Sequence, residues 1–523
     1  MDGNVCSVVA TLHELRLCAR CILRFIDERK SSSYEESYKN VQGLVSEKYG
    51  IEFKSRTNED ENSNGMEVID DDKTNDKQKT EECAHICPSC LGILQEQCDG
   101  TVIKQIEEEV TNSGFEIESF TFSVSLPLCT LVRQHSIFLH LKEKFSDFYS
   151  GKTSVDNLPS IKEVFKWVCG PALGLMLGVF FQHESSFQIL IKFAYDNGNE
   201  ELEFLTEVDP SRFKERKAKK RAPVIPLFSV TSIRKALCDL QTAKQLRKYA
   251  YCPPSFARYK SYCAEVICSH SSILLAGRYN KYSRTLPQTP WIIDGERMLE
   301  SSVQEKICDI LLSKVQADDC KFSSGGREDI DVRMLGTGRP FVAELINPHK
   351  TILSKEFLAH TQKEINLSTT DVKIRHLQVV TKEEYSTLKE AENTKTKTYS
   401  CLVWTEKEIS EKDLEKLTEI KDLKLQQKTP LRVLHRRPLA VREKVIHSMS
   451  TEWKDCHHFT LYLKTMAGTY VKEFVHGDFG RTKPNIGCLL NLEADILELD
   501  VESVDVNWPP PLDPSPEALP SSD

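Results

Sequence analysis

At 523 residues the chain is longer than one hydrophobic core usually supports, so two or three domains are expected. It contains no run of about eighteen or more apolar residues, which argues against a transmembrane helix. The formal net charge is −9, but the stretch from Asn58 to Glu82 alone carries ten acidic and three basic residues. The remainder is therefore close to neutral and has room for basic faces that bind phosphates.

The N-terminal stretch lacks a basic region followed by an apolar run and a small-residue cleavage site. Eighteen cysteines are spread along the chain. In a long chain without a secretory signal, such cysteines indicate reduced thiols and a metal site rather than disulfides. We expect an intracellular protein, in the nucleus or the cytoplasm, with the mitochondrion also open.

The first half of the chain mixes helical and strand patterns. Apolar residues from Val8 to Tyr49 recur at helical spacing, whereas Asn58 to Glu82 has no aromatic residue and predicts a disordered acidic insert, about residues 55–82. The next segments follow the same reasoning: a helix over Leu91–Val110, a strand over Phe115–Leu131, a helix over Ser232–Tyr249 and a strand over Ala264–Ala276.

Two CxxC pairs, Cys18/Cys21 and Cys87/Cys90, lie far apart in the sequence. Two residues between cysteines let both thiolates reach one tetrahedral ion, and two such pairs complete a four-sulfur shell for a structural zinc ion. Cys83, His85 and Cys98 are alternative ligands. The other interpretation is four reduced cysteines in a hydrophobic core.

Three basic stretches are candidates for RNA binding. The runs that begin at Arg212 and at Arg432 are dense in arginine and lysine, although each also fits a solvated surface. Between Gly277 and Arg284, two tyrosines, Tyr279 and Tyr282, alternate with three cations, a pattern that suits stacking on unpaired bases. We place the main domain boundary just after this stretch, near residue 286.

The stretch from Ser323 to Lys350 predicts a hairpin. Ile330, Val332 and Met334 alternate with charged neighbours as in a half-buried strand, and a turn-rich stretch precedes a second strand over Phe341–Ile346. Asp329 then lies where a loop becomes a strand. Further elements are expected downstream: helices over Ser302–Val315, Ser354–Ile365, Lys382–Glu392 and Ser410–Ile420, strands over Val372–Val380, Lys395–Trp404, Phe459–Thr465 and Asp495–Val506, and a proline-rich tail.

Several motifs in this half resemble, in order, those of one enzyme family. They are GRED around Asp329, KTKTY ending at Tyr399, AGTYVKEF around Tyr470 and HGDFGRTKPNIG from His476. Together with the paired cysteines, they resemble the archaeal and eukaryotic pseudouridine synthase family that modifies the T arm of tRNA and carries a THUMP-type accessory domain, family ten of these enzymes.

The resemblance implies roles for individual residues. Asp329 corresponds to the catalytic aspartate, and Arg327 to an arginine that helps to hold the flipped nucleotide. Tyr399 matches the tyrosine stacked under the base and Tyr470 a second aromatic of the active site. Two further positions complete the set: Lys472 matches the basic partner of the aspartate, and Leu489 an apolar residue against the base.

The resemblance also implies the fold and the partners. We expect an α+β protein with a mixed, largely antiparallel sheet in a catalytic domain, and a zinc-pinned α/β THUMP-type domain that binds RNA. The expected ranges are 1–286 for the accessory domain, 287–508 for the catalytic domain and 509–523 for a disordered tail. Structural zinc and no organic cofactor are expected. We also expect a monomer that acts on the tRNA T arm and on other structured RNAs, away from membranes.

Two other functions fit parts of the sequence. Asp329, Asp331 and Glu344 could gather divalent cations in a nuclease assisted by Lys350, although Glu344 lacks a lysine two residues later. A non-catalytic RNA-binding protein would need only the basic stretches and the cysteine pairs. Strand cleavage that requires magnesium would indicate the nuclease, and uridine isomerisation that is insensitive to chelators would indicate the synthase.

Overall fold

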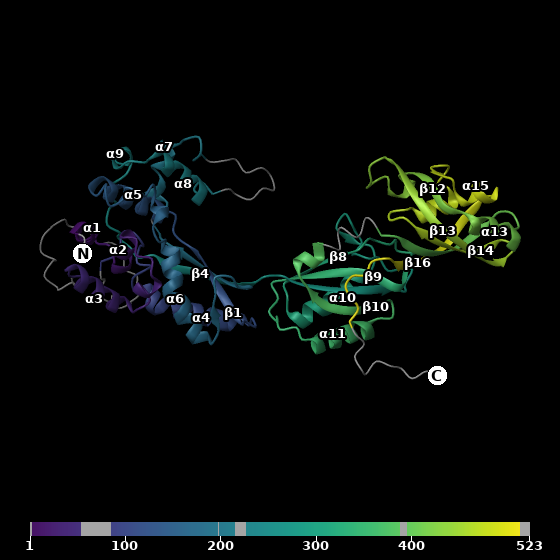
Figure 1. Ribbon diagram of the computed structural model, residues 1–523, viewed down its shortest axis with the longest axis horizontal. Coiled ribbons are helices and arrows are strands. Elements are labelled where there is room, and N and C mark those ends of the chain that lie inside the picture. Colours follow the sequence, from purple (N-terminus) through teal and green to yellow (C-terminus); the bar gives the residue numbers. More distant parts are fainter. Residues whose placement is uncertain (1–2, 54–84, 197, 215–225, 387–394, 513–523) are drawn as a thin grey trace, which may run out of the picture. The chain divides into compact units, whose positions relative to one another are not determined.

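The computed structural model describes residues 3–53, 85–196, 198–214, 226–386 and 395–512 (Figure 1). The chain divides into two compact units, Met1–Ser269 and His270–Asp523. The predicted acidic insert, residues 55–82, lies outside the described residues. Among the described helices, none is long and apolar enough to cross a membrane.

Unit 1 begins with three helices, in the region where the apolar spacing predicts them. They are α1 (Gly3–Glu14), α2 (Ala19–Phe25) and α3 (Tyr38–Tyr49). The side chain of Ser37 caps the last helix by accepting a hydrogen bond from the Asn40 amide. This helical prediction is confirmed.

A four-stranded sheet forms the rest of the core of unit 1, in the order β2-β1-β3-β4. Strand β1 runs parallel to both β2 and β3. Helices α4, α5 and α6 contribute buried apolar side chains to the same core. The bounds are β1 (Ser119–Ser125), β2 (Phe180–Phe181), β3 (Phe187–Ala194), β4 (Tyr262–His270), α4 (Thr101–Ser113), α5 (Cys129–Lys144), α6 (Ile161–Leu177), α7 (Leu205–Val208), α8 (Val230–Asp239) and α9 (Ala243–Leu246).

Three predictions in unit 1 are too long. The strand predicted over Phe115–Leu131 ends at Ser125, because α5 begins soon after Pro127. The helix predicted from Leu91 begins only at Thr101, after a run of turns. The helix predicted over Ser232–Tyr249 breaks after Asp239, and Thr242 then caps the separate helix α9.

The division between the units lies inside one predicted strand. Residues 264–276 form parts of two strands, β4 and β5 (Ile273–Lys281), separated by Ser271 and Ser272. Strand β4 belongs to the sheet of unit 1, whereas β5 belongs to the large sheet of unit 2. The boundary predicted near residue 286 is therefore too late, because alternation along the sequence does not show which sheet a strand joins.

Unit 2 is built on a ten-stranded sheet with the order β10-β5-β9-β16-β11-β14-β13-β12-β15, and β8 pairs with β9. The β16–β9 pair is parallel and the other described pairs are antiparallel. This arrangement confirms an α+β fold with a mixed, largely antiparallel sheet. The strands are β8 (Asp319–Ser324), β9 (Arg333–Ile346), β10 (Val372–Val380), β11 (Lys397–Thr405), β12 (Lys421–Lys428), β13 (Val441–Asp455), β14 (His458–Thr465), β15 (Thr482–Lys483) and β16 (Ala494–Val504).

Helices cover parts of this sheet. Helix α10 packs against α11 and β8, and α11 also packs against β10, as Figure 1 shows. Further along, α13 packs on β13, and α14 contacts β16 and α15. The bounds are α10 (Val303–Val315), α11 (Lys355–Ser368), α13 (Glu411–Glu419), α14 (Val471–His476) and α15 (Ile486–Leu490); strands β6 (Ile292–Ile293) and β7 (Glu296–Arg297) form a separate hairpin. The predicted helix Lys382–Glu392 lies partly outside the described residues.

The central hairpin exists, but its strands are β8 and β9 rather than the predicted pair. Asp329 lies in the segment that connects them, not at the start of a strand. Strand β9 continues through the stretch that predicts a turn, although Gly336 and Gly338 have positive φ angles and the register against β5 shifts there. A Cβ atom on Gly336 would collide with the carbonyl oxygen of Glu502, and one on Gly338 would lie 2.7 Å from the carbonyl oxygen of Tyr279. These glycines allow close approach of neighbouring strands instead of a turn.

A candidate active-site cavity and a four-cysteine centre

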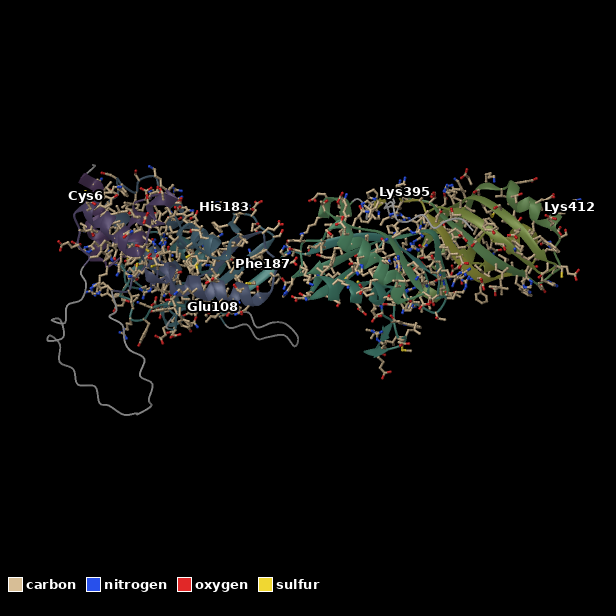
Figure 2. All side chains as sticks on the ribbon, turned by 90° about the horizontal axis from the view of Figure 1, so that it is seen from below. Cys6, Glu108, His183, Phe187, Lys395 and Lys412 are labelled. Carbon is tan, nitrogen blue, oxygen red and sulfur yellow. The ribbon has the colours of Figure 1, made fainter. Side chains whose placement is uncertain are left out.

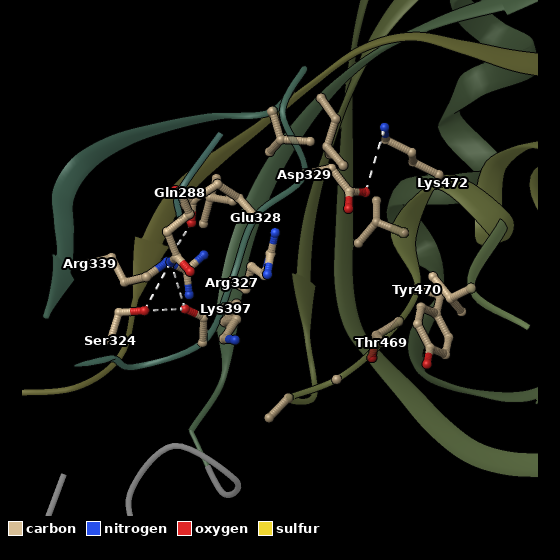
Figure 3. A pocket seen from close by; sticks show the side chains of 18 of the residues that line it. Gln288, Ser324, Arg327, Glu328, Asp329, Arg339, Lys397, Thr469, Tyr470 and Lys472 are labelled. Carbon is tan, nitrogen blue, oxygen red and sulfur yellow. Dashed lines mark hydrogen bonds and ion pairs between the residues drawn. The ribbon is translucent and has the colours of Figure 1, made fainter. Parts of the chain in front are cut away.

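A cavity of about 1230 Å³ opens in unit 2 beside the segment that connects β8 to β9. Five of the six residues that the resemblance assigns to substrate lie on its wall, as Figure 3 shows for four of them. They are Arg327, Asp329, Tyr399, Tyr470 and Lys472. They come from the β8–β9 connection, from strand β11 and from the start of helix α14, so the tertiary fold gathers them from three parts of the sequence.

Leu489 is the exception. It lies on α15 and packs half-buried against the core of unit 2, and it does not line the cavity. Leu499 and Val501 of β16 supply apolar wall instead. The motif fixes the order of residues along the chain but not which apolar side chain faces the cavity, so this assignment by resemblance is not met.

A buried lysine holds the backbone at Asp329. The Lys281 ammonium donates hydrogen bonds to the carbonyl oxygens of Leu286, Asp329 and Ile330, at 2.9, 3.1 and 2.8 Å. Its side chain is fully buried, and this burial lowers its pKa to about 8. Lys281 therefore fixes the direction in which the Asp329 side chain leaves the main chain.

A buried network supports the same segment from the other side. Glu328 accepts hydrogen bonds from the Tyr279 hydroxyl at 2.7 Å and from Arg339 Nε at 2.8 Å. Gln288 donates to the Tyr279 hydroxyl, to Ser324 and to the Gly326 carbonyl oxygen. Burial disfavours the charged guanidinium of Arg339, but the Glu328 carboxylate more than compensates and raises its pKa. Consecutive carboxylates thus have separate tasks: the Glu328 side chain is buried and paired with Arg339, whereas the Asp329 side chain is partly exposed at the cavity.

Gly326 makes room for this arrangement. Its φ angle is +100°, and a Cβ atom there would lie 2.6 Å from a guanidinium nitrogen of Arg339 and 3.1 Å from Lys397 Nζ. A larger residue would displace both cations as well as strain the backbone. The glycine pair before Arg327 therefore serves the close approach of side chains to the loop.

Asp329 is paired with two cations at unequal distances. Its Oδ2 accepts a hydrogen bond from Arg432 at 2.7 Å and lies 3.8 Å from Lys472 Nζ, the pair drawn in Figure 3. Lys472 lies closer to Asp331, at 2.6 Å. Although partial burial acts to raise the pKa of Asp331, the Lys472 ammonium holds it below its ordinary value. The resemblance names Lys472 as the basic partner, whereas Arg432 makes the shorter contact.

Arg432 is held in place by a second carboxylate. Its Nε donates to Glu473 at 2.7 Å, and the Glu473 side chain is almost fully buried. Burial tends to lower the pKa of Arg432, but its carboxylate partners raise it overall. In the sequence Arg432 stands out only as part of a basic run, and Glu473 only as a neighbour of Lys472. No local signal pairs residues so far apart in the sequence.

The two tyrosines are positioned differently. Tyr399 lies on β11 between β14 and β16, and burial raises its pKa to about 12. Tyr470 stands at the start of α14, where the buried side chain of Gln427 both donates to its carbonyl oxygen and accepts from its amide, each at 2.9 Å. Their hydroxyl-bearing rings therefore reach the cavity from anchored backbones.

Cations are abundant along the wall of the cavity. Besides Arg432 and Lys472, they come from the β8–β9 connection, from β11 and from the segment before and within β13: Arg327, Lys397, Arg436, Arg437, Arg442 and Lys444. The run from Arg432 to Lys444 is therefore largely a lining of the cavity. Such a wall favours a polyanion, because each bound phosphate releases counterions.

The nuclease arrangement is not formed. Among the described residues, two groups bring three or more metal-binding side chains together: the four cysteines, and Glu408 with Cys456 and His457. Neither includes Asp329, Asp331 or Glu344. Glu344 instead accepts a hydrogen bond from Ser272, and Asp331 is paired with Lys472.

The predicted stacking stretch, Gly277–Arg284, is mostly core. Tyr279 and Lys281 are fully buried, and Arg278 is 6% exposed. Arg278 donates to the Thr337 hydroxyl and to five carbonyl oxygens, those of Thr337, Gly338, Val504, Val506 and Trp508. Burial lowers its pKa to about 10. Of the two tyrosines in this stretch, only Tyr282 is exposed. The prediction that the stretch forms a stacking surface is therefore wrong. Of the basic run at Arg212, residues 215–221 lie outside the described residues.

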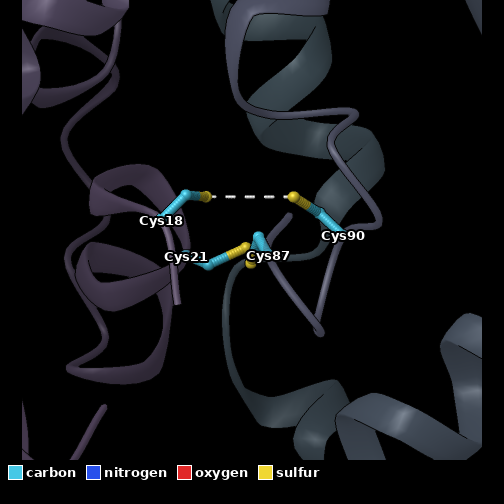
Figure 4. Close-up of side chains that lie close together, drawn as sticks. All are labelled: Cys18, Cys21, Cys87 and Cys90. Carbon is cyan, nitrogen blue, oxygen red and sulfur yellow. Dashed lines mark hydrogen bonds between the residues drawn. The ribbon is translucent and has the colours of Figure 1, made fainter. Parts of the chain in front are cut away.

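The two CxxC pairs do meet in unit 1. Cys18, Cys21, Cys87 and Cys90 are buried, and their sulfur atoms all lie within 4.8 Å of one another (Figure 4). Cys18 Sγ and Cys90 Sγ are 3.8 Å apart. Tetrahedral zinc with Zn–S bonds of about 2.3 Å requires sulfur atoms about 3.8 Å apart, so these residues fit a four-sulfur zinc site.

The alternative ligands lie elsewhere. Cys98 is buried and donates to the Ile93 carbonyl oxygen, and His85 is in contact with Arg16. Neither belongs to the group of four cysteines, and Cys83 lies outside the described residues.

Comparison with known proteins gives two family models that match successive parts of the chain. "Eukaryotic Pus10, N-terminal" matches residues 87–268, and "Pus10, C-terminal" matches residues 274–505. The junction between them coincides with the division between the two units.

The relatives are similar over nearly the whole chain. The protein named tRNA pseudouridine synthase Pus10 from Homo sapiens is 46% identical, over 95% of this chain and 96% of its own length. The Xenopus laevis protein of the same name is 41% identical, over 97% and 98%. The Thermofilum pendens protein of that name is 36% identical over 45% of this chain and 52% of its own length. The chain therefore belongs to the Pus10 family.

Proposed function

We propose that the protein is a tRNA pseudouridine synthase, in which Asp329 isomerises a uridine of the T loop. The observation that carries this proposal is the position of Asp329 in a cation-lined cavity, with Tyr399 and Tyr470 on the same wall. The names of the relatives support the reaction and the class of RNA. The choice of the T loop rests on the resemblance of the motifs around Asp329, Tyr399 and Tyr470.

The reaction rearranges bonds within one nucleotide. The bond from ribose C1′ to uracil N1 breaks, the base rotates, and C1′ bonds to C5. N1 gains a proton and C5 loses one, so the product is an isomer, and neither an oxidant nor a nucleotide cofactor is needed. The base must first leave the helical stack, because its glycosidic bond is not accessible within a structured loop. The cavity is large enough for a nucleoside.

Asp329 supplies the reactive carboxylate. It can attack C1′, attack C6 of the base or remove the 2′ proton, and each route requires the carboxylate to be ionised and correctly aimed. The 2.7 Å contact with Arg432 orients the Asp329 side chain. Lys281 holds the main chain by donating a hydrogen bond to the Asp329 carbonyl oxygen. Residues that act through Asp329 in this way are positioning residues.

Aromatic and cationic side chains bind the substrate. Tyr399 and Tyr470 provide flat apolar surfaces for the extruded base, and the apolar side chains of β16 exclude water near the glycosidic bond. Arg327 and the cations of the segment before β13 bind the phosphates on either side of the flipped nucleotide.

Unit 1 binds the rest of the tRNA, as a THUMP-type domain stabilised by zinc. The four sulfur atoms lie within 4.8 Å of one another, and the 3.8 Å between Cys18 Sγ and Cys90 Sγ supports zinc as the metal. Zinc would link the turn at Cys18–Cys21 to the turn at Cys87–Cys90, and a complete four-sulfur shell leaves no position for a reactive water. The metal is therefore structural, and Asp329 chemistry does not depend on it.

The test is to incubate the wild-type protein with an unmodified tRNA transcript and to map pseudouridine chemically at each position. We expect pseudouridine in the T loop, formed equally well when EDTA is present for the duration of the reaction. RNA cleavage that requires magnesium would support a nuclease instead, and tight binding without any pseudouridine would support a non-catalytic RNA-binding protein.

A further inference from the structure

An exposed aromatic segment lies in unit 1, at residues 249–262; it follows helix α9 and ends at Tyr262, the first residue of strand β4. Over residues 243–262 the sequence contains five cations and no acidic residue. The aromatic side chains are exposed, which is unusual for such large apolar groups. Their exposed fractions are 42% for Tyr249, 79% for Tyr251, 55% for Phe256, 54% for Tyr259 and 48% for Tyr262.

The main chain of this segment is fixed, although its side chains are exposed. Ser136 donates to the Tyr251 carbonyl oxygen at 2.9 Å, and Arg133 donates to that of Ser255 at 2.9 Å. Near the other end, the amide and hydroxyl of Ser261 both donate to the Leu91 carbonyl oxygen. The segment is thus anchored at intervals along its length. Exposed rings on an anchored backbone lose little conformational entropy when they bind a ligand.

Two of these anchors lead to the four-cysteine centre. Leu91 directly follows Cys90, and the guanidinium that holds Ser255 also donates to the carbonyl oxygen of Pro88, at 3.4 Å. Pro88 lies within the Cys87–Cys90 turn. The centre therefore supports the backbone from which the aromatic side chains project.

The alternation of rings and cations defines the ligand. Tyr249 follows Arg247 and Lys248, and Tyr259 lies between Arg258 and Lys260, with all of these side chains exposed. Arg16 stacks over Phe256, 4.3 Å from the ring centroid. Single-stranded RNA presents flat bases joined by phosphates, and it is bound by aromatic stacking within a basic surface. A duplex hides its bases and would contact only the cations.

From these contacts we propose that the 249–262 segment stacks unpaired nucleotides of the RNA substrate, with Tyr251 and Tyr259 as the principal stacking residues. This inference rests on the proposed function for the identity of the RNA, and it adds a second contact outside the cavity. It also assigns to unit 1 the stacking role that the sequence suggests for Gly277–Arg284, where the rings are mostly buried.

The experiment compares two RNA probes with the full-length, zinc-loaded protein. One is a blunt hairpin, and the other is the same hairpin with about six unpaired nucleotides at its 3′ end, within the site sizes that stacking surfaces cover. Binding is measured by fluorescence anisotropy. Wild type should bind the extended hairpin more tightly, and the Tyr251→Leu/Tyr259→Leu double variant should bind it roughly tenfold or more weakly than wild type does, with the blunt hairpin almost unaffected.

Two matched controls define the cause. Phe180→Leu removes a ring that is 76% exposed on β2 of the same unit and should change neither affinity. Lys244→Gln/Lys248→Gln removes charge without removing a ring, and should flatten the dependence of affinity on salt for both probes, whereas the tyrosine variant should leave that slope unchanged. Circular dichroism and thermal melting check that each variant is folded.

An unchanged affinity of the tyrosine double variant for the extended hairpin would overturn the proposal, and so would an equal loss for both probes. The result is independent of catalysis, because the probes need no uridine in a T loop. Wild-type isomerisation of tRNA tests the proposed function separately.

Discussion

The four-cysteine centre and the Asp329 cavity are both assembled from residues far apart in the sequence, but their partners are determined differently. Each cysteine of the centre has a second cysteine three positions away, with two residues between them, so the CxxC spacing itself predicts the two pairs. In the cavity, Asp329 pairs with Arg432, and no spacing links the two. A metal shell has one required geometry, whereas a carboxylate accepts any cation that the fold brings near. The predictions below test that contrast.

The largest effect should come from breaking the cysteine centre. Cys87→Ser/Cys90→Ser should abolish stoichiometric zinc binding and unfold unit 1, because structural zinc in small domains contributes about 10–16 kcal/mol of apparent binding free energy. Zinc content and thermal melting measure this. Cys238→Ser, at an exposed cysteine of the same unit, is the control. A double variant that keeps both its zinc and its melting profile would refute the metal site.

The buried pair beneath the cavity should give the next effect. Glu328→Gln keeps the shape of the side chain but leaves the Arg339 charge unpaired in the core, where both side chains are at most 2% exposed. We expect the free energy of unfolding of unit 2 to fall by about 3–5 kcal/mol. Chemical denaturation measures it, with Glu452→Gln at the exposed Lys454 pair as a control that should change little. If both variants lowered the free energy of unfolding equally, the buried Glu328–Arg339 pair would not be a special support of the loop at Asp329.

The two cations at Asp329 can be ranked directly. Arg432→Gln should lower kcat by about 10- to 100-fold, since it removes a charge-assisted hydrogen bond of 2.7 Å to Asp329. Lys472→Gln should cost less, because Lys472 lies 3.8 Å from Asp329 and is closer to Asp331. Single-turnover rates on saturating tRNA measure both. A larger loss of kcat in Lys472→Gln than in Arg432→Gln would show that Lys472 is the main partner of Asp329, as the resemblance implies.

A smaller effect is expected at Lys281. Lys281→Met should lower kcat by roughly tenfold with little change in KM, because the loop at Asp329 loses the two hydrogen bonds that Lys281 donates to the Asp329 and Ile330 carbonyl oxygens, together with the link to Leu286. In wild type this ammonium loses its proton as the pH rises through about 8, well below the ordinary lysine value. The neutral amine has only two protons for three carbonyl oxygens, so kcat should decline above that pH. The pH profile of the variant should lack this decline; an identical profile would contradict the role.

Much of the fold follows from local patterns. Strand β10 has the bounds that alternation predicts, and α10 begins directly after its capping residue, Ser302. The division between β4 and β5 could not be predicted, because one run of alternating residues feeds two different sheets. Nor could the path of β9, where Gly336 and Gly338 allow close strand packing in a stretch whose composition favours a turn.

The site was predictable in part for a similar reason. Motifs identify residues whose type is required by the chemistry, such as Asp329 and the tyrosines, and these line the cavity. Long-range electrostatic partners, such as Arg432 and Glu473, become visible only after folding. The sequence does not show side-chain exposure either. Tyr279 and Tyr259 have similar cationic neighbours, yet Tyr279 is fully buried and Tyr259 is 54% exposed.

The most direct test of the account is the comparison of Asp329→Asn with Asp331→Asn on one tRNA substrate. The two carboxylates are close neighbours, and both are paired with cations, but only Asp329 lines the cavity. Asp329→Asn should form no detectable pseudouridine while its affinity for tRNA stays within about twofold of wild type, since the change removes reactivity and little binding surface. Asp331→Asn should remain active. Pseudouridine formed by Asp329→Asn would contradict the central claim.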